Sequence, residues 1–136
     1  MVTNLMPRAA WAAMQEKSDS WLVDVRTPGE WNYVGGPDLD AIGNRLIKLS
    51  WHIWPEMKIN PDFVSLLEGE RAARDAHLFF LCRSGGRSLA AAQAVTEAGW
   101  PHAYNILHGF EGDLDGASRR SRINGWKYED LPWRQT

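Results

Sequence analysis

The cysteine in this sequence lies in a stretch rich in glycine and arginine, "LCRSGGRSL", and it is the only one in the chain. Arg83 and Arg87 place positive charge beside the Cys82 thiol, and Gly85 and Gly86 allow backbone conformations that other residues avoid. Successive backbone N–H groups in such a turn can converge on an anion, and a helix start adds partial positive charge. These features favour a thiolate, so we predict that Cys82 is a nucleophile rather than an inert buried cysteine.

Two chemistries use a cysteine in an anion-binding loop before a helix. One is phosphate-ester hydrolysis through a cysteinyl-phosphate, and the other is sulfur transfer through a cysteine persulfide. Cysteine phosphatases resemble one another in a Cys-x5-Arg loop, whereas four residues separate Cys82 from Arg87 here. The shorter loop forms a smaller cradle, which suits one sulfur atom better than a tetrahedral phosphate. The spacing therefore favours sulfur transfer and leaves a phosphatase or arsenate reductase as the less favoured alternative.

The elements that must position this loop have the pattern of an α/β sheet. The apolar run "HLFFLC", residues 77–82, predicts a buried parallel strand, and alanine-rich "RSLAAAQAVTEAG" predicts a helix over residues 87–99. Further strands are predicted over 20–25, 45–50 and 102–107, and further helices over 7–16, from "TPGEW" through Tyr33, and over 60–75. Strands and helices alternate, which indicates a mainly parallel sheet with Cys82 at its carboxyl edge.

Length, charge and cysteine content restrict the class of protein. A chain of 136 residues is predicted to form one domain over residues 1–136. Its formal net charge of -2 gives no electrostatic footprint for nucleic-acid binding. One cysteine permits no internal disulfide, which suits a reducing compartment. The N-terminus has no signal-peptide core and no stretch approaches transmembrane length, so we expect a cytoplasmic protein without a membrane or nucleic-acid partner.

Several motifs together resemble the rhodanese family, the single-domain sulfurtransferases. "CRSGGRS" looks like the family's active-site loop, and "LVDVRTPGEW", residues 22–31, is similar to its Asp-Val-Arg-x-x-x-Glu signature. "AGWPHAYNILHGFEG", residues 98–112, resembles the strand and glycine-rich turn after the catalytic helix, and "GWKYEDLPW" resembles the closing pattern. The resemblance covers most of the chain. It implies a rhodanese-like α/β fold, with helices on both faces of a mainly parallel sheet, and no cofactor.

The resemblance also implies a role for each site residue. Cys82 becomes the nucleophile and sulfur carrier. Asp24, Arg26 and Glu30 look like the family's structural polar cluster near the site, and a buried ion network of this kind is more often architectural than catalytic. Arg87 would also seat an anionic donor such as thiosulfate. The implied substrate-binding residues form the loop itself: Arg83, Ser84, Gly85, Gly86, Arg87 and Ser88.

The implied reaction moves a sulfane sulfur from thiosulfate or a similar donor to cyanide or a thiol. Because no second cysteine exists to resolve the persulfide, an external acceptor must release the sulfur. The alternative is a sulfur-relay module that takes persulfide from a protein partner. Two departures from the family pattern bear on this choice. Residues 35–46 lack the family's Gly-His-Ile run, and residues 109–124 are predicted to form a long loop or flap.

Other side chains receive structural interpretations. The four histidines show no metal-ligand spacing and one cysteine cannot anchor a zinc site, so no metal is expected. Trp51 and Trp54 are expected to pack against other side chains rather than to wall the pocket. The arginines of the 109–124 segment are interpreted as a solvated charged loop.

Overall fold

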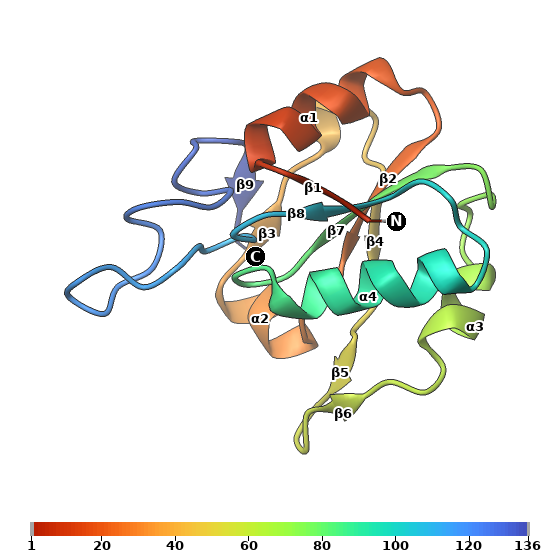
Figure 1. Cartoon of the computed structure of the whole chain (residues 1–136). Coiled ribbons are helices and arrows are strands. Elements are labelled where there is room, and N and C mark those ends of the chain that lie inside the picture. The colour runs from red at the N-terminus through yellow and green to blue at the C-terminus, as the bar shows by residue number, and fades with distance from the viewer. Residues whose placement is uncertain (1, 136) are drawn as a thin grey trace.

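A five-stranded parallel sheet lies at the centre of the computed structural model, which describes residues 2–135 (Figure 1). All of its pairings are parallel, as expected for strands joined by crossover connections. This confirms the predicted α/β class and the mainly parallel sheet. The strands in spatial order are β1 (Thr3–Leu5), β8 (Ala103–Ile106), β7 (His77–Leu81), β2 (Ser20–Asp24) and β4 (Leu46–Lys48).

Helices cover both faces of this sheet because successive side chains of the central strands point to opposite sides. On one face, Leu22 belongs to an apolar cluster that includes residues of α1 (Pro7–Glu16). On the other face, Val23 belongs to a cluster with residues of α3 (Phe63–Glu68) and α4 (Gly86–Glu97). Figure 1 shows α1 on one side of the strands and α3 and α4 on the other. Within residues 2–135, none of the helices is long and apolar enough to span a bilayer.

The helix predicted over residues 60–75 is wrong at both ends, because α3 covers Phe63–Glu68 alone. At its start, the Asn60 side chain accepts a hydrogen bond from the Asp62 backbone N–H at 2.9 Å, which builds a turn rather than a helix. Phe63 and Leu67 are the buried residues of the helix. Beyond Gly69 the sequence offers charged residues and small alanines, so no large apolar side chain anchors another turn.

Three short pairings were missed from the sequence. β1 is a three-residue edge strand with two exposed residues, so the sequence contains no apolar run that would predict it. The other two are antiparallel pairs of two-residue strands, whose formation depends on contacts that the sequence pattern does not show. They are β3 (Gly36–Pro37) with β9 (Trp133–Arg134), and β5 (His52–Ile53) with β6 (Lys58–Ile59).

Two segments flank the carboxyl edge of the sheet. The predicted short helix is α2 (Pro28–Tyr33), which begins at a capping box between Thr27 and Glu30. Residues 109–124 contain no helix or strand, as predicted, and Figure 1 shows them as part of the long blue excursion from the body of the protein. Near the base of this excursion, Asn124 receives a hydrogen bond from the Asp113 backbone N–H at 2.8 Å.

Candidate active site

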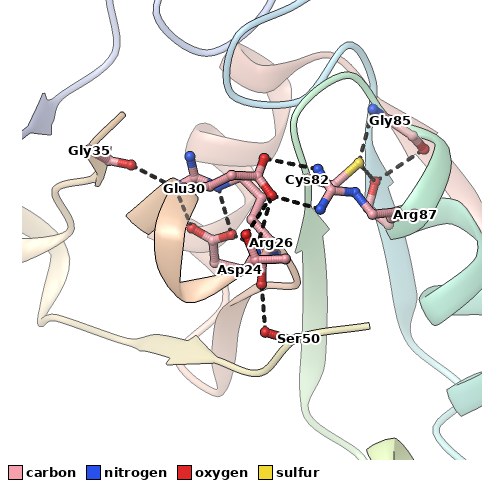
Figure 2. Close-up of polar contacts among 10 residues, drawn as sticks. Asp24, Arg26, Glu30, Gly35, Ser50, Cys82, Gly85 and Arg87 are labelled. Carbon is pink, nitrogen blue, oxygen red and sulfur yellow. Dashed lines mark hydrogen bonds and ion pairs between the residues drawn. The ribbon is translucent and has the colours of Figure 1, made fainter. Parts of the chain in front are cut away.

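Cys82 directly follows β7 at the carboxyl edge of the sheet, and its side chain is buried. The Gly85 backbone N–H donates a hydrogen bond to Cys82 Sγ over 3.1 Å (Figure 2). Gly85 has φ of 116°, a left-handed conformation that glycine adopts without strain. The glycine thus turns its N–H onto the sulfur immediately before α4 begins. A backbone donor in this position stabilises negative charge on the cysteine.

Ser88, in the first turn of α4, is the side chain that contacts the sulfur. Its Oγ lies 3.2 Å from Cys82 Sγ, and the residue is fully buried. The same hydroxyl lies 3.1 Å from the Gly85 carbonyl oxygen. Ser88 therefore links the sulfur to the backbone of the loop that surrounds it.

Arg87 and Glu30 form a fork between α4 and α2 (Figure 2). The Arg87 Nη1 and Nη2 atoms donate to the Glu30 Oε1 and Oε2 atoms over 2.8 and 3.0 Å. Thr27 adds a backbone donor to the same carboxylate over 3.2 Å. The two charged side chains remain 15 % and 21 % exposed, so this pair lies at the rim of the site.

The Arg87–Glu30 pair alters both pKa values. Burial alone would raise the pKa of Glu30, but the hydrogen bonds and charge of Arg87, together with the hydrogen bonds from Thr27, lower it. Burial alone would lower the pKa of Arg87, but Glu30 raises it, and Cys82 contributes in the same direction. Both groups are thus held charged beside the cysteine loop.

Asp24 and Arg26 form a second pair that is fully enclosed. Arg26 Nε donates to Asp24 Oδ1 over 2.9 Å, and Arg26 Nη2 donates to Asp24 Oδ2 and to the Gly35 carbonyl, both over 2.8 Å. The guanidinium lies 4.5 Å from the ring centroid of Phe110. The three residues Asp24, Arg26 and Glu30, grouped together from the sequence, are thus divided between two arginine–carboxylate pairs.

The turn after β8 holds the cysteine loop from its other side. The Phe110 N–H donates to the Cys82 carbonyl over 2.8 Å, and the Glu111 N–H donates to the Arg83 carbonyl over 3.0 Å. Gly109 has φ of 62°, and a Cβ there would lie 2.4 Å from the Cys82 carbonyl oxygen. A glycine is required at this position because the two backbones touch.

The remaining loop residues differ in their exposure to solvent. Arg83 is exposed, Ser84 is half-buried, and Gly86 is exposed with open space where a Cβ would stand. The structure thus gathers all the residues of the predicted loop around Cys82. Their roles in substrate binding, including that of Arg87, stay predictions.

An apolar groove of about 500 Å³ lies beside Glu30. Trp54 is 72 % exposed and lines this groove, so the expectation that it packs rather than walls a pocket is wrong. Trp51 does pack, edge-on against Phe63 with 5.1 Å between ring centroids. The groove is lined by Thr27, Pro28, Gly29, Glu30, Tyr33 and Trp54.

Two asparagines near the cysteine were missed from the sequence. Asn105 on β8 is buried and its Oδ1 lies 2.6 Å from Ser88 Oγ. Its Nδ2 donates to Asn4 Oδ1 on β1 over 3.0 Å. The available signal was a polar residue inside the predicted strand over 102–107, which a buried position tolerates only with hydrogen-bond partners.

Comparison with known proteins identifies the chain. A family model described as the STR4 middle domain matches residues 4–136. The chain belongs to this family. The crystal structure of Rv0390 from M. tuberculosis is similar to this chain, with 40 % identity and a TM-score of 0.90. That match covers 99 % of this chain and 98 % of the other.

Two more distant structures share the fold of this chain. The polysulfide-sulfur transferase of Wolinella succinogenes has a TM-score of 0.67 at 22 % identity, covering 99 % of this chain and 80 % of the other. A rhodanese-related protein from Thermoplasma volcanium has a TM-score of 0.60 at 17 % identity, covering 98 % and 99 %. The fold is therefore rhodanese-like, as the sequence motifs predict.

Proposed function

We propose that this protein is a sulfurtransferase that carries sulfane sulfur on Cys82 as a persulfide. The observation that carries the proposal is the hydrogen bond of 3.1 Å from the Gly85 N–H to Cys82 Sγ, at the start of α4. A backbone donor aimed at the sulfur favours the anionic nucleophile, and the loop needs no movement to provide it. The rhodanese-like fold and the polysulfide-sulfur transferase among similar structures support the same chemistry.

The loading step uses thiosulfate or a similar anionic donor. The Cys82 thiolate attacks the outer sulfur of thiosulfate, the bond between the two donor sulfurs breaks, and sulfite leaves with its electron pair. The product is a Cys82 persulfide anion, so three negative charges stand on each side of the equation. Arg83 is exposed at the loop and supplies the positive charge that attracts the donor dianion.

The release step needs an external acceptor because the chain has one cysteine. Cyanide attacks the outer sulfur of the persulfide, thiocyanate leaves, and the Cys82 thiolate returns. A thiolate acceptor attacks the same atom and departs as a persulfide of its own. Each cycle therefore moves one sulfur atom from donor to acceptor and returns Cys82 to its starting state.

The decisive experiment is the intact mass of the protein after exposure to thiosulfate. The wild type should gain one sulfur atom, and cyanide should remove it with release of thiocyanate. Cys82→Ser should gain nothing and form no thiocyanate, because no other thiol can hold sulfur. Thermal unfolding of both proteins controls for loss of fold. Wild-type protein that never gains sulfur, or Cys82→Ser at wild-type activity, would contradict the proposal.

The apolar groove beside Glu30 favours a second candidate, a sulfur relay that receives persulfide from a protein partner. Trp54 and Tyr33 are 72 % and 84 % exposed there, and exposed aromatic side chains are common anchors in protein interfaces. The relay predicts loading from a persulfide-carrying protein and slow turnover with thiosulfate and cyanide. Trp54→Ala should then weaken loading from the protein donor and leave loading from thiosulfate unchanged.

Aryl phosphates test the remaining alternative. The four-residue spacing brings Arg87 one residue nearer to Cys82 than in a phosphatase loop, so the cradle is too small for a phosphoryl group. We expect hydrolysis of aryl phosphates at background level in a preparation that forms persulfide readily. Efficient turnover of an aryl phosphate would contradict the argument from loop size.

A further inference from the structure

A buried chain of polar side chains runs from the cysteine to the edge of the sheet. It passes from Cys82 Sγ to Ser88 Oγ over 3.2 Å, and on to Asn105 Oδ1 over 2.6 Å. From there Asn105 Nδ2 donates to Asn4 Oδ1 over 3.0 Å. Cys82, Ser88 and Asn105 are all buried, while Asn4 is exposed on β1. β1 and β8 pair with Asn4 opposite Asn105, so the sheet register itself brings the two amides together.

The distances determine which atom donates in this chain. A separation of 2.6 Å is typical of an O–H···O hydrogen bond and too short for a normal N–H···O bond. Ser88 therefore donates its hydroxyl hydrogen to Asn105 Oδ1. The hydrogen bond at the other end of the side chain fits this orientation of the Asn105 amide, because Nδ2 donates to Asn4 Oδ1 over 3.0 Å. Asn4 thus holds the Asn105 oxygen toward Ser88.

This direction has a consequence for the sulfur. A serine hydroxyl has one hydrogen, so a hydroxyl that donates to Asn105 presents only lone pairs to Cys82. Lone pairs can accept a hydrogen bond from the neutral thiol, but they repel a thiolate. In a persulfide the negative charge lies on the outer sulfur and not on Sγ, which is the atom that Ser88 contacts. The contact therefore opposes the bare thiolate without opposing the loaded anion.

We propose that Asn105, anchored by Asn4, is a positioning residue that draws the Ser88 hydroxyl hydrogen away from Cys82 and so favours the thiol and the persulfide over the bare thiolate. The part concerning the persulfide rests on the proposed sulfurtransferase function. Asn105 thus opposes the effect of the Gly85 N–H, which donates to the same sulfur and stabilises the thiolate. The balance between these two contacts sets how readily the unloaded cysteine reacts.

Removal of the Asn105 oxygen should free the Ser88 hydrogen for the sulfur. The Gly85 carbonyl lies 3.1 Å from Ser88 Oγ, but it already accepts the Leu89 N–H over 3.3 Å. The bond to Gly85 is longer than the 2.6 Å bond to Asn105, and its acceptor is shared with a second donor. It should therefore compete less with an anionic sulfur than Asn105 does, and the hydrogen should turn to the thiolate. In Asn105→Leu, which keeps the branch at Cγ but has no polar atom, Cys82 should therefore ionise at lower pH than in the wild type.

Alkylation of Cys82 by iodoacetamide across a pH series measures this ionisation. We expect the midpoint of the rate profile to fall by about one pH unit in Asn105→Leu, since a hydrogen bond to a charged group has roughly that effect. The same substitution in a Ser88→Ala background should leave the midpoint where Ser88→Ala alone places it. Asn4→Val, at an exposed position, should shift the midpoint in the same direction by less, because the unanchored amide can rotate.

A matched control is Tyr104→Phe, which also removes a polar group from β8. None of these variants changes a charged group on the elements around Cys82. Tyr104 belongs to the cluster on the opposite face of the sheet, so its loss should leave the midpoint unchanged. The unchanged charged and titratable groups are Arg83 in the loop, Arg87 on α4, Glu30 on α2, Asp24 and Arg26 at the end of β2, and His108 and Glu111 after β8.

The outcomes separate this inference from the proposed function. Alkylation needs no sulfur donor, so it tests the Asn105 effect even in a protein that cannot load sulfur. An unchanged midpoint in Asn105→Leu would overturn the proposal, and so would an equal shift in the Ser88→Ala background. Should Asn105→Leu fail to fold, Asn4→Val decides the same question. At equal thiosulfate, Asn105→Leu should also show a several-fold lower ratio of persulfide to unloaded protein by intact mass; an unchanged ratio would overturn the persulfide part.

Discussion

Two arginine–carboxylate pairs, Asp24–Arg26 and Arg87–Glu30, differ in burial and in the parts of the chain that they join. The Asp24–Arg26 pair has side chains 1 % and 0 % exposed, and it connects neighbours in sequence to the Gly35 carbonyl. The Arg87–Glu30 pair is 15 % and 21 % exposed, and it joins two helices at the rim of the cysteine site. The same chemical groups therefore stand in two different environments.

The difference in burial indicates what each ion pair contributes to the protein. A pair removed from water has lost the solvation of both charges, so loss of one partner leaves the other buried without compensation. A partly exposed pair costs less to break, because water can solvate the group that remains. We infer that Asp24–Arg26 acts mainly on stability, whereas Arg87–Glu30 acts mainly on the shape and charge of the cysteine loop.

The largest effect is expected from Arg26→Met. This change leaves the Asp24 carboxylate buried without its partner and removes the hydrogen bond to the Gly35 carbonyl. The free energy of unfolding should fall by roughly 3–5 kcal/mol, as measured by urea denaturation. The double variant Asp24→Asn, Arg26→Met should recover part of this loss, since no charge then stays buried. A loss of less than about 1 kcal/mol would contradict the architectural role.

The same substitution at the rim, Arg87→Met, should act on sulfur loading instead. Without the fork to Glu30, the first turn of α4 loses a fixed positive charge beside Cys82. Loading from thiosulfate, followed by intact mass, should slow by on the order of 10- to 100-fold. The free energy of unfolding should change by about 1 kcal/mol or less. If Arg26→Met and Arg87→Met lowered the free energy of unfolding equally, the proposed difference between the two pairs would be wrong.

The smallest effect is expected from Glu30→Gln, on the way in which the free energy of unfolding depends on pH. Its pKa in the folded protein lies below the usual 4.5, because Arg87 and Thr27 together outweigh the effect of burial. The carboxylate therefore stabilises the fold above about pH 4.5, and this contribution is lost as the pH falls through the lowered pKa. Glu30→Gln should be less stable than the wild type near neutral pH by about 1 kcal/mol or less. The difference should shrink in urea denaturations below pH 4.5, whereas a constant difference would exclude this titration.

The cysteine loop and the elements on either side of it could be predicted from the sequence, because their signals are local. The apolar run before Cys82 forms β7 (His77–Leu81), and the alanine-rich stretch forms α4 (Gly86–Glu97). The predicted ends lie within two residues of the observed ones. The short helix after Thr27 was also predicted, since its proline and acidic residue lie at its own start.

Elements without such local signals were missed or misplaced. β1 has three residues and no continuous apolar run, and it forms because β8 presents a free edge to it. The helix predicted over 60–75 was too long because its second half is charged and reaches the core only through the small side chain of Ala72. In both cases tertiary contacts, or the lack of them, override the local pattern.

The sequence by itself determined that Cys82 stands in a charged glycine turn between a buried strand and a helix. Only the tertiary structure decided which side chains reach that turn. Glu30 binds Arg87 across 57 positions of the chain, and Asn4 binds Asn105 across 101. Such partners depend on strand order and register, because a shift by one residue would turn Asn105 to the other face of the sheet and away from Ser88.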